Sequence, residues 1–154
     1  MKIFYRFFLY GFIGICLEIL WTGLDSLLKC DFSLMGRTSI WMIFIYGLAL
    51  FLEPFHDILK KYNFVIRGII YMILIFEVEY LSGSLLRYFL GVCPWQYDYY
   101  SLNGLITLYY IPVWFLLGFL FEKIHYILDS KNIKTKNNLK IKNTTNSIIK
   151  RNQL

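Results

Sequence analysis

Charged residues are scarce in this 154-residue sequence: Asp, Glu, Lys and Arg make up only 17% of it. Soluble domains carry about 25% charged residues and roughly 45–50% apolar residues. Here hydrophobic residues reach 58%, and 20% of all residues are aromatic. The composition therefore excludes an ordinary soluble domain and favours a protein embedded in a lipid bilayer.

Cysteines are also few, and their spacing excludes two common kinds of small protein. The three cysteines are Cys16, Cys30 and Cys93, and no C-x-x-C pair occurs. They indicate neither a disulfide scaffold nor a zinc site. Cys30 and Cys93 are expected in loops on the same side of the membrane, which leaves a bridge between them open, with free thiols as the favoured alternative.

Net positive charge is missing from most of the chain. Residues 1–128 hold nine Lys or Arg and nine Asp or Glu, whereas residues 129–154 hold seven Lys or Arg and one Asp. The net charge of +6 therefore belongs to a low-complexity tail, which we expect to be cytoplasmic and attracted to anionic lipids. This distribution gives no reason to expect nucleic acid as a partner.

Four stretches are long and apolar enough to cross a bilayer core of about 30 Å, which requires roughly 20 helical residues. They lie at about residues 3–24, 38–59, 64–90 and 105–128. Helices are expected because lipid offers no hydrogen-bonding partner to an open backbone. The sequence thus predicts an all-α integral membrane protein with four transmembrane helices in residues 1–128 and no soluble domain. Pro54 should kink the second helix, because proline removes the hydrogen bond to the Leu50 carbonyl.

The positions of Lys and Arg predict the orientation of these helices, since basic residues concentrate in cytoplasmic loops. Lys2 and Arg6 stand at the start of the first stretch, and Lys60 and Lys61 separate the second from the third. The basic tail follows the fourth stretch, and the opposite loops carry fewer basic residues. We therefore expect a multi-pass protein of the cell membrane with both termini in the cytoplasm.

Ionisable residues within the predicted helices are the main candidates for a functional site, because they are costly in lipid and usually line a pathway or a site. Glu77 and Glu79 lie two residues apart and should point to roughly opposite faces of one helix. Glu18 and Glu79 are expected to form a network with Arg37 and Arg87. Whether such a network binds a substrate or only holds the bundle together stays open here. The candidate polar core comprises Glu18, Arg37, Tyr46, Glu53, Glu77, Glu79, Arg87, Trp95 and Glu122.

The second and fourth stretches end alike. LALFLEPFHDIL (Leu48–Leu59) aligns without gaps onto LGFLFEKIHYIL (Leu117–Leu128), and each holds a Glu-x-x-His motif. The simplest explanation is a duplicated two-helix hairpin.

The same motif suggests a metal site with low probability. Glu-x-x-His on two helices belongs to the ligand set of di-iron bundles, which needs two further glutamates at the same depth. Glu18 is expected near the opposite membrane surface, so we predict no metal site. The residues concerned would be Glu53, His56, Glu122 and His125.

No catalytic constellation is evident either. Both histidines are expected at the opposite membrane face from Cys93, which excludes a Cys-His pair, and we name no catalytic residue and no cofactor. The Cys93–Tyr97 segment is expected to be an interfacial loop in which Trp95 and neighbouring tyrosines form part of an aromatic belt.

Five motifs follow one another between about Phe7 and Leu128. They are GRTSIWMIFIYGL (36–48), LEPFHD (52–57), RGIIYMILIFEVEYLSG (67–83), GVCPWQY (91–97) and PVWFLLGFLFEKIH (112–125). In this order they resemble the bacterial family described as putative ABC-transporter type IV permeases. The resemblance implies a permease-like membrane subunit of unknown substrate. It also implies a separate ATPase subunit, because the sequence has no Walker A motif, and an oligomer or partner, because four helices are few for a permease.

Three functions stay open at this point. The leading one is a transport subunit with a polar intramembrane site. The alternatives are an integral membrane enzyme that acts on a lipid or amphiphile through Glu and His clusters, and a structural or accessory membrane protein. Membrane lipids are the expected partners in all three.

Overall fold

Helices make up most of this protein in the computed structural model, which describes residues 2–130. The chain divides into two compact units, and each is described by itself: the first unit is Met1–Phe121 and the second unit is Glu122–Leu154. The last helix covers residues 111–130, so that 111–121 belong to the first unit and 122–130 to the second. The predicted tail is described only as far as Ser130; residues 131–154 lie outside the described residues.

Three helical stretches of the described residues are long and apolar enough to cross a membrane: Ile3–Leu28, Trp41–Leu59 and Leu108–Ser130. The first coincides with α1 (Lys2–Leu28). The remaining long helix, α4 (Phe64–Leu90), has the same length of 27 residues but is not among the three. It carries two glutamates and an arginine in its second half. The composition of the described helices therefore supports three membrane spans, one fewer than the sequence led us to expect.

The second span consists of three short helical segments. They are α2 (Trp41–Gly47), the 3-10 helix η1 (Leu48–Leu52) and α3 (Glu53–Leu59). Pro54 stands in the first turn of α3, where a missing backbone N–H costs little. The second span thus changes to a tightened 3-10 segment directly before the proline, and the kink expected at Pro54 stays a prediction.

Glycines allow α1 to approach α2 closely. A side chain at Gly11 would collide with the backbone carbonyl of Ile43, and one at Gly14 would collide with the ring of Tyr46. Small residues at helix contacts let two backbones come together in lipid, where packing rather than water exclusion holds helices together. This contact fixes the position of Tyr46 beside α1.

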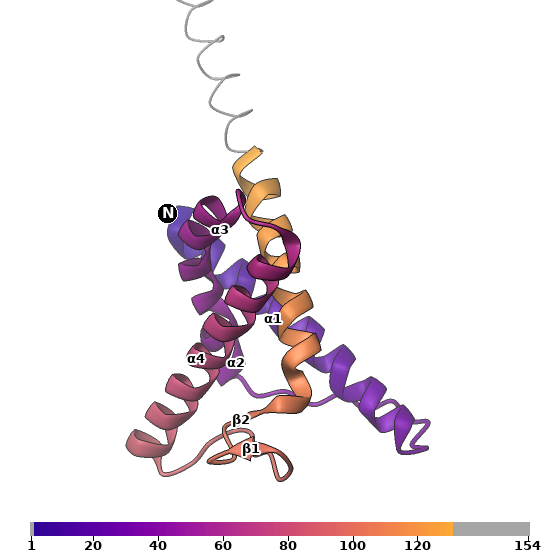
Figure 1. The fold of residues 1–154 in the computed structure, drawn as a ribbon. Coiled ribbons are helices and arrows are strands. Elements are labelled where there is room, and N and C mark those ends of the chain that lie inside the picture. Colours follow the sequence, from indigo (N-terminus) through magenta and orange to yellow (C-terminus); the bar gives the residue numbers. More distant parts are fainter. Residues whose placement is uncertain (1, 131–154) are drawn as a thin grey trace, which may run out of the picture. The chain divides into compact units, whose positions relative to one another are not determined.

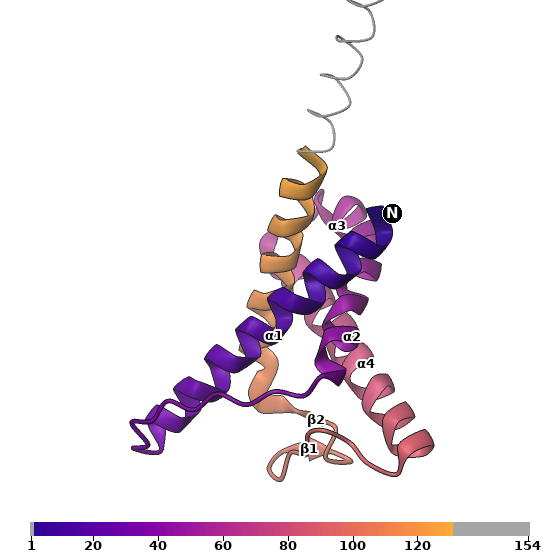
Figure 2. The same ribbon diagram turned by 180° about the vertical axis from the view of Figure 1, so that it is seen from behind.

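Both ends of α4 are set by local sequence. Asn63 caps the first turn, because its side-chain oxygen accepts a hydrogen bond from the backbone N–H of Ile66 at 2.9 Å. Gly91 ends the helix with a φ of 69°, a left-handed conformation that glycine adopts at little cost. Within the first unit, the N-terminus and the turn from α3 to α4 lie at one end, and the C-terminal ends of α1 and α4 lie at the other (Figures 1 and 2).

A small hairpin after α4 departs from the predicted all-α fold. Strands β1 (Ser101–Leu102) and β2 (Ile106–Thr107) pair antiparallel, with Ser101 opposite Thr107. Three residues, 103–105, connect the strands, and Asn103 and Gly104 have φ values of 54° and 71°, as the two central residues of a type I′ turn require. Because the hairpin takes up residues 101–107, the last helical stretch does not begin near residue 105 as predicted. It begins with the 3-10 helix η2 (Leu108–Tyr110).

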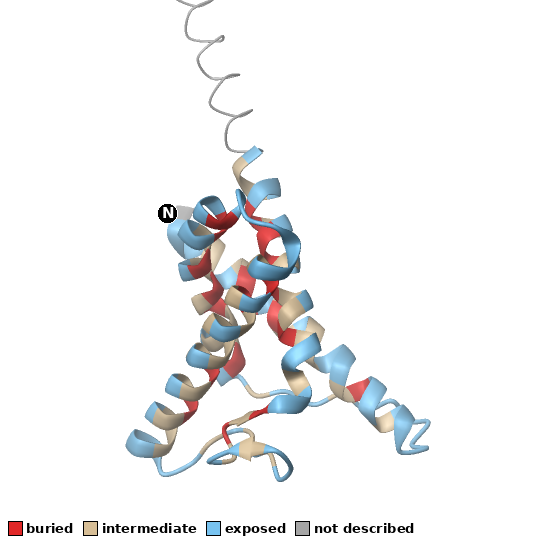
Figure 3. Ribbon diagram, viewed as in Figure 1, coloured by how far each residue is buried: buried red, intermediate tan, exposed pale blue. Residues whose placement is uncertain are grey.

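Buried side chains of the first unit gather where its helices cross, and much of the remaining helix surface is exposed (Figure 3). The largest fully buried side chains are Tyr10, His56 and Tyr71. Large apolar side chains are exposed along α1 and α4, among them Phe12, Leu20, Ile73, Leu81 and Leu85. Extensive apolar surface of this kind marks a membrane or protein contact, and the composition of these helices fits lipid.

The close approach of α1 and α2 predicts a specific sensitivity at Gly14. The variant Gly14→Val should lower the free energy of unfolding by roughly 1–3 kcal/mol, because the new side chain forces Tyr46 out of place. Denaturant unfolding in mixed micelles measures the change. Cys16→Val introduces the same side chain at an exposed position of α1 and is the matched control. Equal effects of the two variants would contradict the proposed packing.

Candidate functional site

The first unit contains a partly open cavity of about 740 Å³. Cavities of roughly 300–1,000 Å³ are the usual size of small-molecule sites. The walls come from α1, α2, η1 and α4, from the loops before α2 and after α4, and from residues 110–121. Most lining side chains are apolar, and two carboxylates, Glu18 and Glu79, stand among them.

Glu79 is the most buried ionisable residue of this cavity, with 8% of its surface exposed. One carboxylate oxygen accepts a hydrogen bond from the Tyr97 hydroxyl at 2.8 Å. The other accepts one from the indole N–H of Trp114 at 3.0 Å. The carboxylate thus connects α4 to the loop that follows it and to the last helix within the first unit.

Tyr97 remains protonated and can donate to Glu79. Burial raises the pKa of the Tyr97 phenol well above its usual value, and the negative charge of Glu79 raises this pKa further. Tyr97 therefore keeps its proton over the whole physiological pH range.

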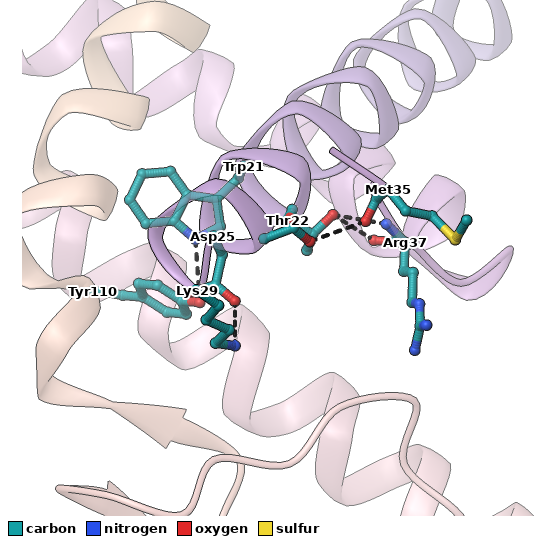
Figure 4. Close-up of polar contacts among 8 residues, drawn as sticks. Trp21, Thr22, Asp25, Lys29, Met35, Arg37 and Tyr110 are labelled. Atoms are coloured by element: carbon teal, nitrogen blue, oxygen red, sulfur yellow. Dashed lines mark hydrogen bonds and ion pairs between the residues drawn. The ribbon is translucent and has the colours of Figure 1, made fainter. Parts of the chain in front are cut away.

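Glu18 reaches the cavity from α1 and is half-buried. Its carboxylate accepts a hydrogen bond from the Thr38 hydroxyl at 3.1 Å. One helical turn further, Thr22 accepts a hydrogen bond from the backbone N–H of Arg37 at 2.8 Å and donates its own hydroxyl proton to the Glu18 carbonyl at 2.8 Å. These bonds hold the 37–38 segment against α1, and Figure 4 shows the Arg37 guanidinium extending away from Thr22.

Aromatic rings form a continuous row along one wall. The indole N–H of Trp21 donates to the Tyr110 hydroxyl at 3.3 Å, as Figure 4 shows. The Tyr110 ring lies 5.3 Å from the ring of Tyr97 and 5.3 Å from that of Trp114, measured between centroids. Because Tyr97 and Trp114 also hold Glu79, this row brings aromatic faces next to a carboxylate.

The predicted network of Glu18 and Glu79 with Arg37 and Arg87 is not formed. Among residues 2–130, no ion pair joins either glutamate to either arginine. Arg87 follows Glu79 by eight residues, about 12 Å along a helix, and donates instead to the backbone carbonyl of Asn103 in the hairpin turn at 2.8 Å. The prediction was wrong because neutral aromatic donors, and not arginines, satisfy Glu79.

The cavity brings together five of the nine predicted site residues, namely Glu18, Arg37, Tyr46, Glu79 and Trp95. Trp95 is fixed by a hydrogen bond from its indole N–H to the carbonyl of Leu105 at 2.9 Å. Glu77 and Arg87 do not line this cavity, and Glu77 is exposed on the opposite face of α4 from Glu79. The expectation that the two glutamates point to different faces is therefore confirmed.

Glu53 lies in a separate polar group near the N-terminus. Its carboxylate pairs with the Arg6 guanidinium at 2.8 Å and accepts a hydrogen bond from the Tyr10 hydroxyl at 2.8 Å. The neighbouring His56 ring packs edge-on against Tyr71, with 4.8 Å between centroids. This group connects α1, α3 and α4 through buried side chains, and it does not line the cavity.

The second Glu-x-x-His motif belongs to the second unit. There His125 lies 3.7 Å from the carboxylate of Asp129, one turn further on the same helix. The described residues include no group of three or more His, Cys, Asp or Glu side chains that could hold a metal ion. Cys16, Cys30 and Cys93 are free thiols, so the bridge left open between Cys30 and Cys93 is not formed.

The hydrogen-bond donors to Glu79 were not predicted from the sequence. The sequence search concentrated on ionisable side chains and overlooked Trp114 and Tyr110, while it assigned Tyr97 only to an interfacial belt. A signal for them exists, because buried Trp and Tyr side chains need a polar partner for their N–H or O–H group. Tyr97 and Trp114 also fall in two of the distinctive motifs, GVCPWQY and PVWFLLGFLFEKIH.

These features define a helical membrane protein that encloses a largely apolar cavity with carboxylates in its wall. The family model described as putative ABC-transporter type IV matches residues 5–149. The chain belongs to this family. No solved structure matches it.

Replacement of Glu79 and of Glu77 in α4 by leucine should have different effects on the free energy of unfolding. Glu79→Leu should lower the free energy of unfolding by roughly 1–3 kcal/mol, because the Tyr97 hydroxyl and the Trp114 N–H lose their acceptor. Glu77→Leu should raise it or leave it unchanged, since the Glu77 side chain is exposed and substitutions at exposed positions usually change stability by about 0.5 kcal/mol or less.

Unfolding of both variants and the parent protein in the same lipid–detergent mixture provides the comparison. The two substitutions are chemically identical and lie two residues apart, so each serves as the control for the other. A larger loss of stability in Glu77→Leu than in Glu79→Leu would contradict the assignment of the buried face.

Proposed function

We propose that this chain is the membrane subunit of a transport system and that the cavity of the first unit is its substrate-binding site. The observation that carries the proposal is the carboxylate-containing cavity of about 740 Å³, because ionisable groups in an intramembrane cavity commonly mark a transport pathway. Membership of the ABC-transporter type IV family supports the same function.

We propose that the cavity binds its substrate without forming a covalent bond to it, because of the side chains that line it. Histidine and cysteine are both missing from the side chains that line this cavity of the first unit. A nucleophile with an adjacent general base is the usual requirement for attack on a lipid ester. The printed sequence also has no Walker A motif, so we propose that a separate subunit hydrolyses ATP.

We further propose that α4 is a fourth transmembrane helix. Its 27 residues extend about 40 Å, more than the hydrocarbon core requires. Three of its four charged side chains have partners within the protein: Glu79 lies in the cavity wall, Arg87 contacts the hairpin turn, and Arg67 lies over the ring of Phe119. Glu77 then remains as the single carboxylate on the outer face of the helix.

The proposed orientation places the N-terminus and the turn between α3 and α4 in the cytoplasm. These segments lie at the same end of the first unit (Figures 1 and 2) and carry Arg6, Lys60 and Lys61. Concentration of basic residues at one end is typical of the cytoplasmic side. The hairpin and the Cys93–Tyr97 segment then face the outside.

Filling the cavity should abolish ligand binding. Val78 lines the cavity on α4, and Val78→Phe adds bulk to its wall. Binding can be followed with a bromine-labelled alkyl probe, because Trp21, Trp95 and Trp114 line the cavity and bromine quenches tryptophan fluorescence on contact. We expect saturable quenching in the parent protein and at least a several-fold weaker response in Val78→Phe.

The matched control is Leu81→Phe, a similar enlargement at an exposed position of the same helix. It should leave the saturable quenching unchanged. In protein purified with its ATPase partner, the probe should also alter the rate of ATP hydrolysis in the parent and in Leu81→Phe, but not in Val78→Phe. Equal behaviour of the two variants in both assays would contradict the proposal.

Cysteine labelling tests the proposed orientation. In a cysteine-free background, Cys30 restored alone should react with a membrane-impermeant maleimide in intact cells, because it lies in the exposed loop after α1. Lys61→Cys, at the turn between α3 and α4, should react only after the membrane is permeabilised. The opposite labelling pattern would require an inverted topology.

A further inference from the structure

We infer that the ligand of this cavity is a cationic amphiphile, a quaternary or protonated amine carried on an alkyl chain. This inference rests on the proposed function and adds the chemical class of the substrate. It follows from the charges, the aromatic faces and the apolar surface that the cavity presents together.

Negative charge is in excess in the cavity wall. Two carboxylates, Glu18 and Glu79, line it together with one guanidinium, that of Arg37. Arg37 is exposed and forms no ion pair with either glutamate among the described residues. The hydrogen bonds to the glutamates come from neutral donors, so that neither carboxyl group has a counter-ion among residues 2–130.

Aromatic rings adjoin these carboxylates. Trp21, Tyr97 and Trp114 each contact Tyr110, with ring centroids 5.3–5.9 Å apart. Aromatic faces attract cations through their negative ring quadrupole, most strongly where water is excluded. A trialkylammonium group suits such a wall better than an anion, since it can contact the rings through its methyl groups and the carboxylates through its charge.

The rest of the lining suits an alkyl chain. Apolar side chains continue the cavity from the carboxylates, and they include Met42, Leu48, Leu52, Leu117, Leu120 and Phe121. They offer no hydrogen-bonding group to a second polar end of a ligand. A molecule with one cationic head and one apolar tail therefore matches the distribution of polar and apolar groups.

The test compares probes that share a dodecyl chain and differ in the head group: trimethylammonium, sulfate, maltoside and phosphocholine. Each is titrated below its micellar concentration into the full-length chain in lipid nanodiscs, and binding is measured by competition with the bromine-labelled alkyl probe. We expect the trimethylammonium compound to bind about tenfold or more tightly than the maltoside, as a cation at a desolvated aromatic and acidic site should. Higher ionic strength should reduce this preference.

Glu18→Gln is the main variant because, within the described part of the chain, the Glu18 carboxylate accepts a single side-chain hydrogen bond, so that the substitution should leave the fold intact. It should reduce the preference for the cation several-fold, and Glu79→Gln should reduce it further if that protein folds. Glu77→Gln makes the same charge change on the outer face of α4 and is the matched control. It should leave the preference unchanged.

Each other outcome overturns a defined part of the proposal. Equal affinity for all head groups would overturn the cationic class while leaving the cavity as an amphiphile site. Preference for the sulfate would overturn the class as well and would point to Arg37. Phosphocholine binding as tightly as trimethylammonium would overturn the need for a net cation and point to a membrane lipid. Failure of every probe to bind would overturn the proposed function itself.

Discussion

The packing of the first unit depends on the two hydrogen bonds that the Glu79 carboxylate accepts. Its two oxygens are shared between the Tyr97 hydroxyl and the Trp114 N–H, so a single side chain of α4 holds both the loop after α4 and the following helix. A buried carboxylate without partners is strongly destabilising, and two aromatic donors without an acceptor would be destabilising as well. The three side chains therefore require one another, and their mutual satisfaction fixes the wall of the cavity.

Close contacts elsewhere keep the opposite wall in place. Gly11 and Gly14 bring α1 against α2, and the Thr22 hydroxyl holds the backbone of Arg37 beside α1. The helices are thus tied together at their crossing points, while much of their outer surface remains exposed, as Figure 3 shows, and carries large apolar side chains. The cavity wall therefore combines hydrogen-bonded groups from α1, α4 and the adjoining loops with aliphatic side chains from η1 and residues 116–120.

The helical character and the opposite faces of Glu77 and Glu79 could be predicted from the sequence, because both depend on local periodicity and composition. The partners of the buried glutamates could not be predicted, since they depend on how Tyr97 and Trp114 fold back onto α4 across 18 and 35 residues of sequence. Complementary charge was the signal used for these partners, and it led to Arg37 and Arg87, neither of which pairs with Glu18 or Glu79 among residues 2–130. The hairpin at Asn103-Gly104 was missed although this dipeptide is a strong turn signal, because the apolar run after it was assigned entirely to a helix.

Photo-crosslinking tests the central claim most directly, namely that the cavity beside Glu79 is a ligand site. A dodecyltrimethylammonium probe with a diazirine in its chain would be activated on the full-length protein in nanodiscs, and the modified residues would be mapped by mass spectrometry. The claim predicts saturable labelling of cavity residues such as Leu52, Val78 and Leu117, which unlabelled probe prevents. Labelling confined to exposed positions such as Ile73 and Leu81, and insensitive to competitor, would contradict it.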